Sequence, residues 1–382
     1  MENKKILYVA TYDKVIMNIY LPYIIALKNI GFNIYVATSE DGDIPYITEK
    51  FKYEFDVSTL SVTNFEVIKA VKSMREMLNV EEFDFIHTHG LNASFITAMA
   101  ATNIRKNGKT KIIYTADGLS FDSNSSKSSY ALYYSIEKLL AKNIDYMITV
   151  NKEDYEFAKD DFKNCKVYYI DGYGIKKEEV DIDVSDELEE KLRKELMLKD
   201  DQKLILNVGD YTKENNQEYL LKAMSIIKDK TRNVKIVFVG KDKLNGKLKK
   251  LASDYDISNN VLFLDLNKKQ TALIYAISDL YIDVSLQKNY PYDIIVAMIN
   301  YLPIISTKVR GNVDLIKNNV TGYLIDNNDV DDLCKKIMIL LQNEQVCDNF
   351  IENYDGLYED YLYENVTDQM CKIYNEIVNW LL

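Results

Sequence analysis

His87 and His89 are the only histidines in the chain, and they follow directly on the apolar run that begins at Phe83. Residues two apart on a strand point to the same face, so the two imidazoles are expected side by side. An H-x-H pair can begin a metal site, but such sites need three or four ligands and no further histidine is available. We therefore expect no metal, and interpret the pair as strand-end residues that line a cleft.

A polar loop, Ser285–Tyr292, lies between the apolar run Leu280–Val284 and an apolar set at helical spacing, Asp293–Asn300. In a doubly wound sheet, ligands sit beyond the carboxyl ends of the strands. The helix that follows such a loop presents free N–H groups and the positive end of its dipole to that place. The loop is therefore a candidate ligand site, and its candidate binding residues are Ser285, Lys288, Tyr290 and Pro291.

Strands and helices alternate along the chain and would bring these residues to the edges of parallel sheets. The runs expected to be strands are Ile6–Thr11, Asn33–Thr38, Phe83–His87, Lys111–Ala116, Tyr146–Val150, Val167–Ile170, Leu204–Val208, Val234–Val239, Val261–Leu264 and Leu280–Val284. No G-x-G-x-x-G follows the first strand, where Tyr12–Asp13–Lys14 stands instead. A dinucleotide-binding dehydrogenase is therefore disfavoured.

The 382 residues are too many for one hydrophobic core and fit two domains. We predict an α/β protein with an N-terminal Rossmann-like lobe over 1–180 and a C-terminal one over 204–360. The charge-rich stretch 181–203 is expected to be a linker helix. The segment 361–382, which contains the only tryptophan, Trp380, is expected to be a terminal helix.

Several stretches in the same order resemble the retaining family 4 glycosyltransferases with the GT-B fold, which build bacterial capsule and exopolysaccharide. Matching stretches are His87–His89, Thr115–Phe121, Leu132–Ala141, Ile148–Tyr155, Gly172–Gly174, Ser285–Pro291 and Ala297–Met298. The resemblance implies two lobes with a cleft between them, the first on the acceptor side and the second on the donor side. It also implies that the terminal helix packs back on the first lobe. The donor would be a nucleotide-sugar, with no cofactor, and the acceptor a glycan or a lipid-linked sugar.

Positions that carry chemistry in that family are replaced here. The family's histidine beside the reacting sugar corresponds to Asp117, which with His89 is the candidate catalytic pair. The loop after the second lobe's first strand usually reads G-[RE]-x-x-x-x-K-N-Q, which puts Asp210 and Asn215 at the positions of the diphosphate-binding cations. Two glutamates of the S-x-x-E-G-x-P…E-A-M pattern become Lys288 and Val296.

The residues expected around the donor are therefore Gly209, Asp210, Lys213, Asn215, Gly240, Ser285, Lys288, Tyr290, Pro291 and Val296. Lys213 is the only cation in the first loop. Each lost charge-assisted contact is worth roughly 1.5–3 kcal/mol. Lys288 either replaces the missing phosphate cation or is an exposed loop lysine, and we favour the second interpretation.

Two functions of different class follow. One is a glycosyltransferase of surface-polysaccharide assembly that holds its donor through backbone groups and Lys213, Lys288 and Tyr290. The other is a catalytically inactive protein of the same fold that binds a glycan, a lipid-linked acceptor or an active partner transferase. A sugar-nucleotide epimerase with two similar lobes is a weaker third possibility.

The net charge of −12 argues against a nucleic-acid groove. The cluster Arg105, Lys106, Lys109 and Lys111 is basic and either meets phosphate or lipid headgroups or, as we favour, is an exposed loop. The four cysteines show no C-x-x-C spacing, and no run reaches the length of a membrane span. We expect a cytoplasmic protein, with peripheral contact at the inner face of a membrane as an option.

Overall fold

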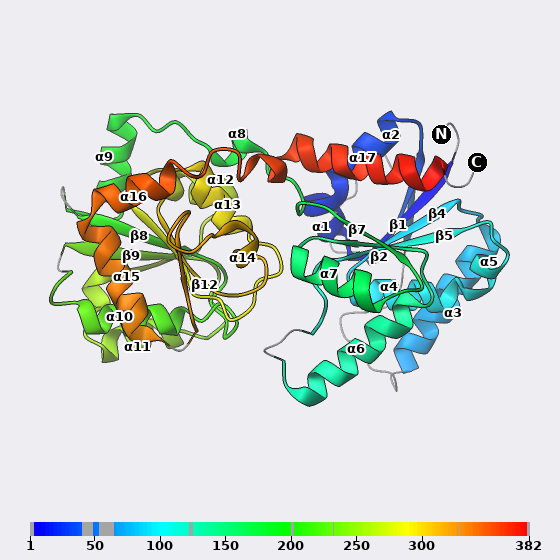
Figure 1. Ribbon diagram of the computed structural model, residues 1–382, viewed down its shortest axis with the longest axis horizontal. Helices are drawn as coiled ribbons and strands as arrows, with labels where there is room; N and C mark the ends of the chain where they lie inside the picture. The colour runs from blue at the N-terminus through cyan, green and yellow to red at the C-terminus, as the bar shows by residue number, and fades with distance from the viewer. Residues whose placement is uncertain are drawn as a thin grey trace. The chain divides into compact units, whose positions relative to one another are not determined.

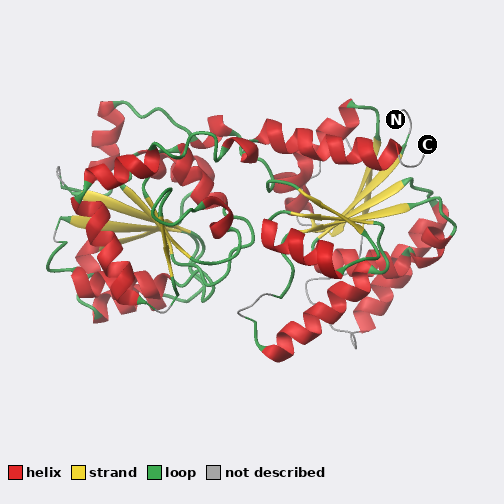
Figure 2. Ribbon diagram, in the orientation of Figure 1, coloured by secondary structure: helices red, strands yellow, loops and turns green. Residues whose placement is uncertain are grey.

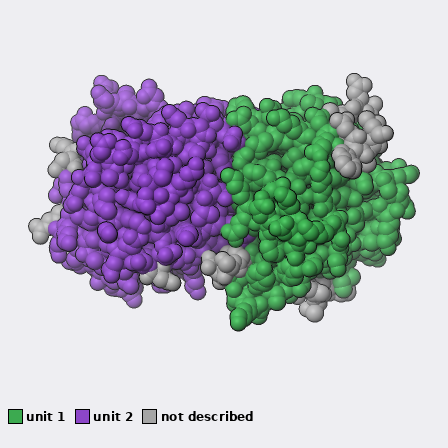
Figure 3. Space-filling view, viewed as in Figure 1, with its two compact units in different colours: residues 1–174, 364–382 green, residues 175–363 purple. Residues whose placement is uncertain are grey.

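A computed structural model describes residues 4–39, 49–52, 65–121, 125–199, 202–231, 233–327 and 329–379. The chain divides into two compact units, which are residues 1–174 with 364–382 (unit 1) and residues 175–363 (unit 2) (Figure 3). The division thus falls at Gly174 and Tyr363, whereas the sequence placed it at 180 and 361. Each unit is a parallel sheet flanked by helices, so the predicted α/β architecture with two Rossmann-like sheets is confirmed (Figure 2).

Unit 1 contains a seven-stranded parallel sheet in the order β3-β2-β1-β4-β5-β6-β7. Its strands are β1 (Lys5–Tyr12), β2 (Asn33–Ser39), β3 (Glu49–Lys52), β4 (Phe85–His89), β5 (Lys111–Ala116), β6 (Tyr146–Thr149) and β7 (Lys166–Tyr169). The central strands β1, β4 and β5 are nearly continuous apolar runs because helices cover both faces of a parallel sheet. The strands β2 and β3 lie on one side of β1, and β4 to β7 lie on the other side. The switch point of unit 1 is therefore at the carboxyl ends of β1 and β4.

The helices of unit 1 are α1 (Asp13–Val15), the π-helix η1 (Ile16–Tyr20), α2 (Leu21–Asn29), α3 (Phe65–Val80), α4 (Leu91–Ala100), α5 (Thr102–Lys106), α6 (Lys127–Ala141), α7 (Lys152–Asp161) and α17 (Tyr363–Asn379) (Figure 1). Nearly all of α17 belongs to unit 1, although it is the last helix of the chain. Its residues Met370, Tyr374 and Ile377 share a core cluster with β1 and α2. Gln369 fixes it further, because its carboxamide accepts from the backbone N–H of Asp171 (3.0 Å) and donates to the Asp171 carboxylate (2.8 Å). Trp380 lies outside the described residues.

Unit 2 contains a six-stranded parallel sheet in the order β10-β9-β8-β11-β12-β13. Its strands are β8 (Lys203–Val208), β9 (Val234–Val239), β10 (Val261–Leu264), β11 (Leu280–Asp283), β12 (Ile304–Thr307) and β13 (Tyr323–Ile325). Its helices are α8 (Lys177–Val180), α9 (Asp186–Glu195), α10 (Gln217–Ile227), α11 (Lys247–Asp254), the short η2 (Ser258–Asn260), α12 (Lys268–Ala276), α13 (Tyr292–Ile299), α14 (Asn312–Leu315), α15 (Val330–Gln342), α16 (Glu344–Ile351) and the short η3 (Glu359–Tyr361). The switch point of this sheet lies between β8 and β11.

The stretch predicted as a linker helix, 181–203, belongs to unit 2 and is helical only over α9, from Asp186 to Glu195. None of the helices in the described ranges combines the length and hydropathy needed to cross a bilayer. Across those same ranges no group of three or more metal-ligating side chains is found. All four cysteines are free thiols.

Candidate functional site

Two loops predicted from the sequence meet at the switch point of unit 2. The β8–α10 loop, 209–216, and the β11–α13 loop, 284–291, leave adjacent strands at their carboxyl ends. The backbone N–H of Leu286 donates to the Glu214 carbonyl (2.7 Å), and the Asn216 carboxamide donates to the Val284 carbonyl (3.2 Å). These bonds fix one loop against the other, so the two form a single surface.

Gly240, directly after β9, permits a very close approach of two backbone segments. A Cβ atom at this position would lie 2.2 Å from the Gly209 carbonyl oxygen and 2.8 Å from the Asp210 nitrogen. Such distances are far inside van der Waals contact, so only glycine fits. The β8–α10 loop therefore owes its path to Gly240 as well as to its own Gly209.

A Gly240→Ala variant is expected to lose about 3 kcal/mol of stability, because the added methyl group must displace backbone atoms. Gly246→Ala is the matched control: Gly246 also has a positive φ, of 80°, but nothing lies within 4 Å of its added Cβ. Only backbone strain of about 1 kcal/mol is expected there. Urea unfolding of the two variants measures the difference, and equal midpoints would show that the close approach at Gly240 is absent.

Asp210 and Asn215, which stand at the family's two cation positions, make hydrogen bonds that stabilise the β8–α10 loop. The Asp210 carboxylate accepts from the backbone N–H of Lys241 (2.9 Å), and the Asn215 carboxamide donates to the Asp210 carbonyl (2.8 Å). Ser285 is buried and its hydroxyl lies 3.5 Å from the Asn215 carboxamide oxygen. Lys213 is exposed on the same loop. Within the β8–α10 loop itself, 209–216, Lys213 is the only positively charged side chain.

Lys288 is not the exposed loop lysine that we favoured from the sequence. Its side chain is only 16% exposed, and its ammonium lies 2.8 Å from Asp293 and 3.6 Å from Asp283. Burial alone would lower the pKa of Lys288, but the attraction of Asp293 and Asp283 outweighs burial and raises this pKa above its ordinary value. Its charge is thus neutralised inside the protein by two carboxylates, which weakens the alternative role as a phosphate cation.

Three further predicted donor-site residues lie on or before α13. Val296 is 1% exposed and packs in the hydrophobic core of unit 2, so its position cannot reach solvent in this arrangement. Pro291 is buried and caps the amino end of α13. The Tyr290 ring is half-buried and stacks against Tyr361, with ring centroids 6.4 Å apart. Among the three, Tyr290 keeps the most surface for a ligand.

Beside the switch point of unit 1, Asp117 follows β5, the strand next to β4, and is held by two tyrosines. The hydroxyls of Tyr20 (2.6 Å) and Tyr173 (2.7 Å) both donate to Asp117 Oδ1. Burial raises the pKa of Asp117 above its ordinary value, and these two hydrogen bonds lower it in part. Oδ2 points towards Gly90, 3.8 Å from where a Cβ would stand. Asp117 is half-buried, so this second oxygen is the one placed to accept from a ligand.

His87 and His89 are core residues. They lie at the end of β4, which finishes at His89, as predicted, but they are 0% and 2% exposed, so the prediction that they line a cleft is wrong. His87 makes hydrogen bonds with Tyr374 and Thr115, both 2.7 Å, and burial lowers its pKa to about 3. The rings of the two histidines lie side by side, with centroids 4.3 Å apart, as the strand spacing predicted.

His89 lies beneath the ring of Tyr20, with centroids 3.6 Å apart. Neither of its ring nitrogens has a hydrogen-bond partner among the described residues. Burial, and to a smaller extent His87, holds the pKa of His89 well below its ordinary value. His89 is therefore a neutral side chain that supports Tyr20, and its predicted catalytic role stays a prediction.

Sequence reasoning missed Tyr20 and Tyr173. Tyr20 ends the π-helix η1, a wider turn of the kind often found at functional sites, and this turn directs its hydroxyl to Asp117. No sequence pattern marks a π-turn, so nothing in the sequence indicated Tyr20. Tyr173 stands between the glycines of the Gly172–Gly174 match, and that match was its only signal.

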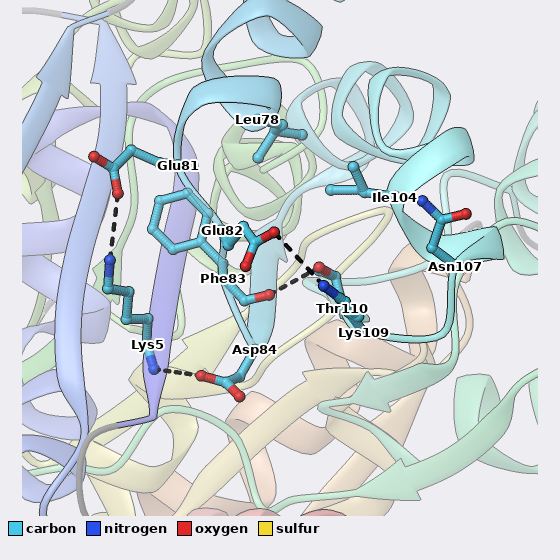
Figure 4. Close-up of a pocket in the computed structure, with 10 residues that line it drawn as sticks. All are labelled: Lys5, Leu78, Glu81, Glu82, Phe83, Asp84, Ile104, Asn107, Lys109 and Thr110. Carbon is cyan, nitrogen blue, oxygen red and sulfur yellow. Dashed lines mark hydrogen bonds and ion pairs between the residues drawn. The ribbon is translucent and has the colours of Figure 1, made fainter.

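The basic cluster near residue 105 is paired with acidic side chains. Arg105 and Lys111 both contact Asp145 (3.1 and 3.3 Å), and Lys109 lies 3.8 Å from Glu82. Lys109 also lines a pocket of about 530 Å³ at the amino ends of β1, β4 and β5 (Figure 4). Lys5 lines the same pocket, and its ammonium lies 3.3 Å from the Glu81 carboxylate. This pocket lies at the edge of the sheet opposite to Asp117, and its charges are matched internally.

Comparison with known proteins covers nearly the whole chain. The family model described as "Glycosyl transferase 4-like" matches residues 5–151, and "Glycosyl transferases group 1" matches residues 189–355. The chain is 27% identical over 345 residues to the putative glycosyltransferase EpsD of Bacillus subtilis, covering 90% of this chain and 89% of that one. It is 28% identical over 320 residues to an Escherichia coli protein named UDP-Gal:alpha-D-GlcNAc-diphosphoundecaprenol alpha-1,3-galactosyltransferase, covering 80% and 79%.

The solved structure of Anabaena HepE in complex with UDP and glucose superimposes with a TM-score of 0.75 at 16% identity, covering 98% of this chain and 100% of that one. The sucrose-phosphate synthase of Thermosynechococcus elongatus gives a TM-score of 0.77 at 16% identity, with coverage of 98% and 99%. At this identity the likeness shows the fold, and the family models supply the family. The chain belongs to the family 4 glycosyltransferases, which have the GT-B fold.

Proposed function

We propose that this protein acts in surface-polysaccharide assembly, such as capsule or exopolysaccharide, and transfers a sugar from a nucleotide-sugar to a glycan or lipid-linked acceptor. The observation that carries the proposal is the joining of the β8–α10 and β11–α13 loops at the switch point of unit 2. Loops in that place bind nucleotides in doubly wound sheets. The likeness to HepE, solved with UDP and glucose, supports the same use of the fold.

The acceptor class rests on the relatives. The Escherichia coli relative is named for UDP-Gal as donor and a diphosphoundecaprenol-linked sugar as acceptor. Another relative, 26% identical over 310 residues, is a Klebsiella pneumoniae protein described as lying in the cps region. Both support a lipid-linked or growing glycan as the acceptor.

A donor would be bound here by groups other than the charged residues that the family usually has. Backbone N–H groups of the two loops and the exposed Lys213 are the positive groups available to a diphosphate, because Lys288 is neutralised by Asp283 and Asp293. In unit 1, Asp117 Oδ2 is suited to accept a hydrogen bond from a sugar hydroxyl, since Tyr20 and Tyr173 already occupy Oδ1. Transfer would then depend more on positioning than on charge.

A second candidate function is supported by the same residues. Groups that would bind a donor are missing at three positions. The charge of Lys288 is neutralised, Val296 lies in the core, and Asp210 accepts a hydrogen bond from the backbone N–H of Lys241. A catalytically inactive member of the family that binds a glycan or an active partner transferase is consistent with that pattern.

Calorimetric titration with UDP, GDP, UDP-glucose and UDP-galactose tests the proposal. Micromolar binding of one nucleotide is expected, and Lys213→Ala should weaken it about tenfold, the size of one charge-assisted contact. Lys222→Ala, an exposed lysine on the neighbouring α10, is the matched control and should leave affinity unchanged. An absence of binding at millimolar nucleotide would contradict a donor-dependent transferase and favour the second candidate.

A further inference from the structure

Two acidic side chains are buried behind the loop that carries Asp117. Glu137, on α6, is 0% exposed, and Asp154, in the first turn of α7, is 3% exposed. Both lie inside stretches that carry the family resemblance, Leu132–Ala141 and Ile148–Tyr155, yet neither can contact a ligand. Their burial therefore calls for a role within the protein.

The two carboxyl groups hold successive backbone groups of the Asp117 loop. Asp154 Oδ2 accepts from the N–H of Leu119 (2.9 Å) and from the Asn151 carboxamide (2.7 Å). The Glu137 carboxyl accepts from the hydroxyl of Tyr114 (3.4 Å) and lies beside the backbone N–H of Ser120. The loop 117–121 is thus bonded to α7 at Leu119 and lies against the Glu137 carboxyl of α6 at Ser120.

The two acids differ in their surroundings. Asp154 accepts hydrogen bonds from two N–H groups. Glu137 has no cationic partner among the described residues, and its Oε2 has no hydrogen-bond partner there. A second carboxylate beside Asp154 in a buried place is strongly disfavoured, so Glu137 is expected to be neutral. Burial, together with the charge of Asp154, raises the pKa of Glu137 to about 8.

Within the part of the chain that the structure describes, no other charge faces Glu137. The helix α4, which packs against α6, has no titratable side chain, and β5 contributes only the phenol of Tyr114. Lys138, the next residue on α6, lies half-buried beside Asp161 (3.5 Å) and does not pair with Glu137. The ionisation of Glu137 is therefore opposed by its surroundings and relieved only when the loop opens to water.

We propose that Glu137 is a positioning residue for Asp117, and that as a neutral acid it works with the ionised Asp154 to hold the loop 117–121 in place. Ionisation of Glu137 sets two like charges beside each other under the loop. The loop then opens more readily, and Asp117 with it. This proposal concerns the loop itself and does not depend on which ligand the protein binds.

Amide hydrogen exchange of the whole protein, read at the loop and as a function of pH, tests the proposal. The protection factors of Leu119 and Ser120 are expected to fall about tenfold per pH unit between pH 6 and pH 8, because the opened loop lets Glu137 ionise at its ordinary pKa. In Glu137→Gln, which keeps the shape and cannot ionise, the same protection factors should be independent of pH. The amides of β8 in unit 2, which does not contain Glu137, serve as an internal control and should show no such fall in either protein.

A constant protection factor in the natural protein, or a fall that persists in Glu137→Gln, would overturn the proposal. So would loop protection factors as high as those of β6, because the loop would then open only when the whole of unit 1 unfolds, and Glu137 would be an ordinary member of the core. Asp154→Asn provides a second test should Glu137→Gln fold poorly. Removing the neighbouring charge makes Glu137 easier to ionise in the folded protein. The fall in the loop protection factors should therefore end at a lower pH than in the natural protein. A fall that ends at the same pH would also contradict the proposal.

Discussion

A Lys288→Glu variant is expected to lose about 3–5 kcal/mol of stability in unit 2. The substitution installs the residue that the family usually has at this position, but here it would bring three carboxylates together. Asp283 is 2% exposed at its side chain and Asp293 is 17% exposed, so water screens their repulsion poorly. Calorimetric unfolding of unit 2 at neutral pH measures the loss.

Lys213→Glu is the matched control, because it makes the same exchange on an exposed side chain of the same site. A change within about 0.5 kcal/mol is expected for it. Neutralising both partners, in the triple variant Lys288→Glu with Asp283→Asn and Asp293→Asn, should restore most of the lost stability. Equal stability of Lys288→Glu and Lys213→Glu would show that Lys288 is not engaged by the two aspartates.

Lys288 also shows why a single return to the family's residue is unfavourable at this position. The buried lysine is tolerated because Asp283 and Asp293 neutralise it, and a glutamate would be tolerated only without them.

The stability of unit 1 is expected to pass through a maximum near pH 6.5. Below that pH, His87 and His89 must stay neutral to remain buried, so the folded state binds fewer protons than the unfolded state and stability falls as pH falls. Above it, Glu137 keeps its proton in the folded state up to about pH 8, while the unfolded chain has already lost it. Stability therefore falls again, by about 1.4 kcal/mol per pH unit.

Thermal unfolding of unit 1 between pH 4.5 and pH 9 checks this expectation. In Glu137→Gln the decline on the alkaline side should disappear, which leaves a plateau above pH 6.5. Unit 2 contains neither histidine nor Glu137, so its transition is an internal control without this maximum. Stability that rises steadily through pH 8, or a decline that survives in Glu137→Gln, would contradict the assignment.

The strands and the place of the site could be predicted from the sequence because both depend on local pattern. Continuous apolar runs followed by polar turns indicated the positions of β1, β5, β8 and β9 to within about a residue. The rule that ligands bind beyond the carboxyl ends of the strands then selected the loop after β11, and the family resemblance selected the loop after β8. The strand β3 was missed, since Glu49–Lys52 alternates charged residues and shows no apolar run.

The errors concern residues whose partners are distant in the chain. His87 was predicted to line a cleft, but Tyr374, at the other end of the sequence, completes its burial and its hydrogen bonding. Lys288 looked exposed because the positions of Asp283 and Asp293, five residues away on either side, match neither helical nor strand spacing. Such contacts arise from tertiary structure and have no signature in local sequence.

The position of α17 affects how the protein folds during synthesis. Met370, Tyr374 and Ile377 share a core with residues of α2 and of the strands β1, β2, β4, β5 and β6, all of which precede unit 2 in the chain. These three residues leave the ribosome only after all of unit 2 has emerged. We therefore expect unit 2, although encoded second, to reach its native state first, while unit 1 stays incomplete and exposes apolar surface until translation of α17 is finished.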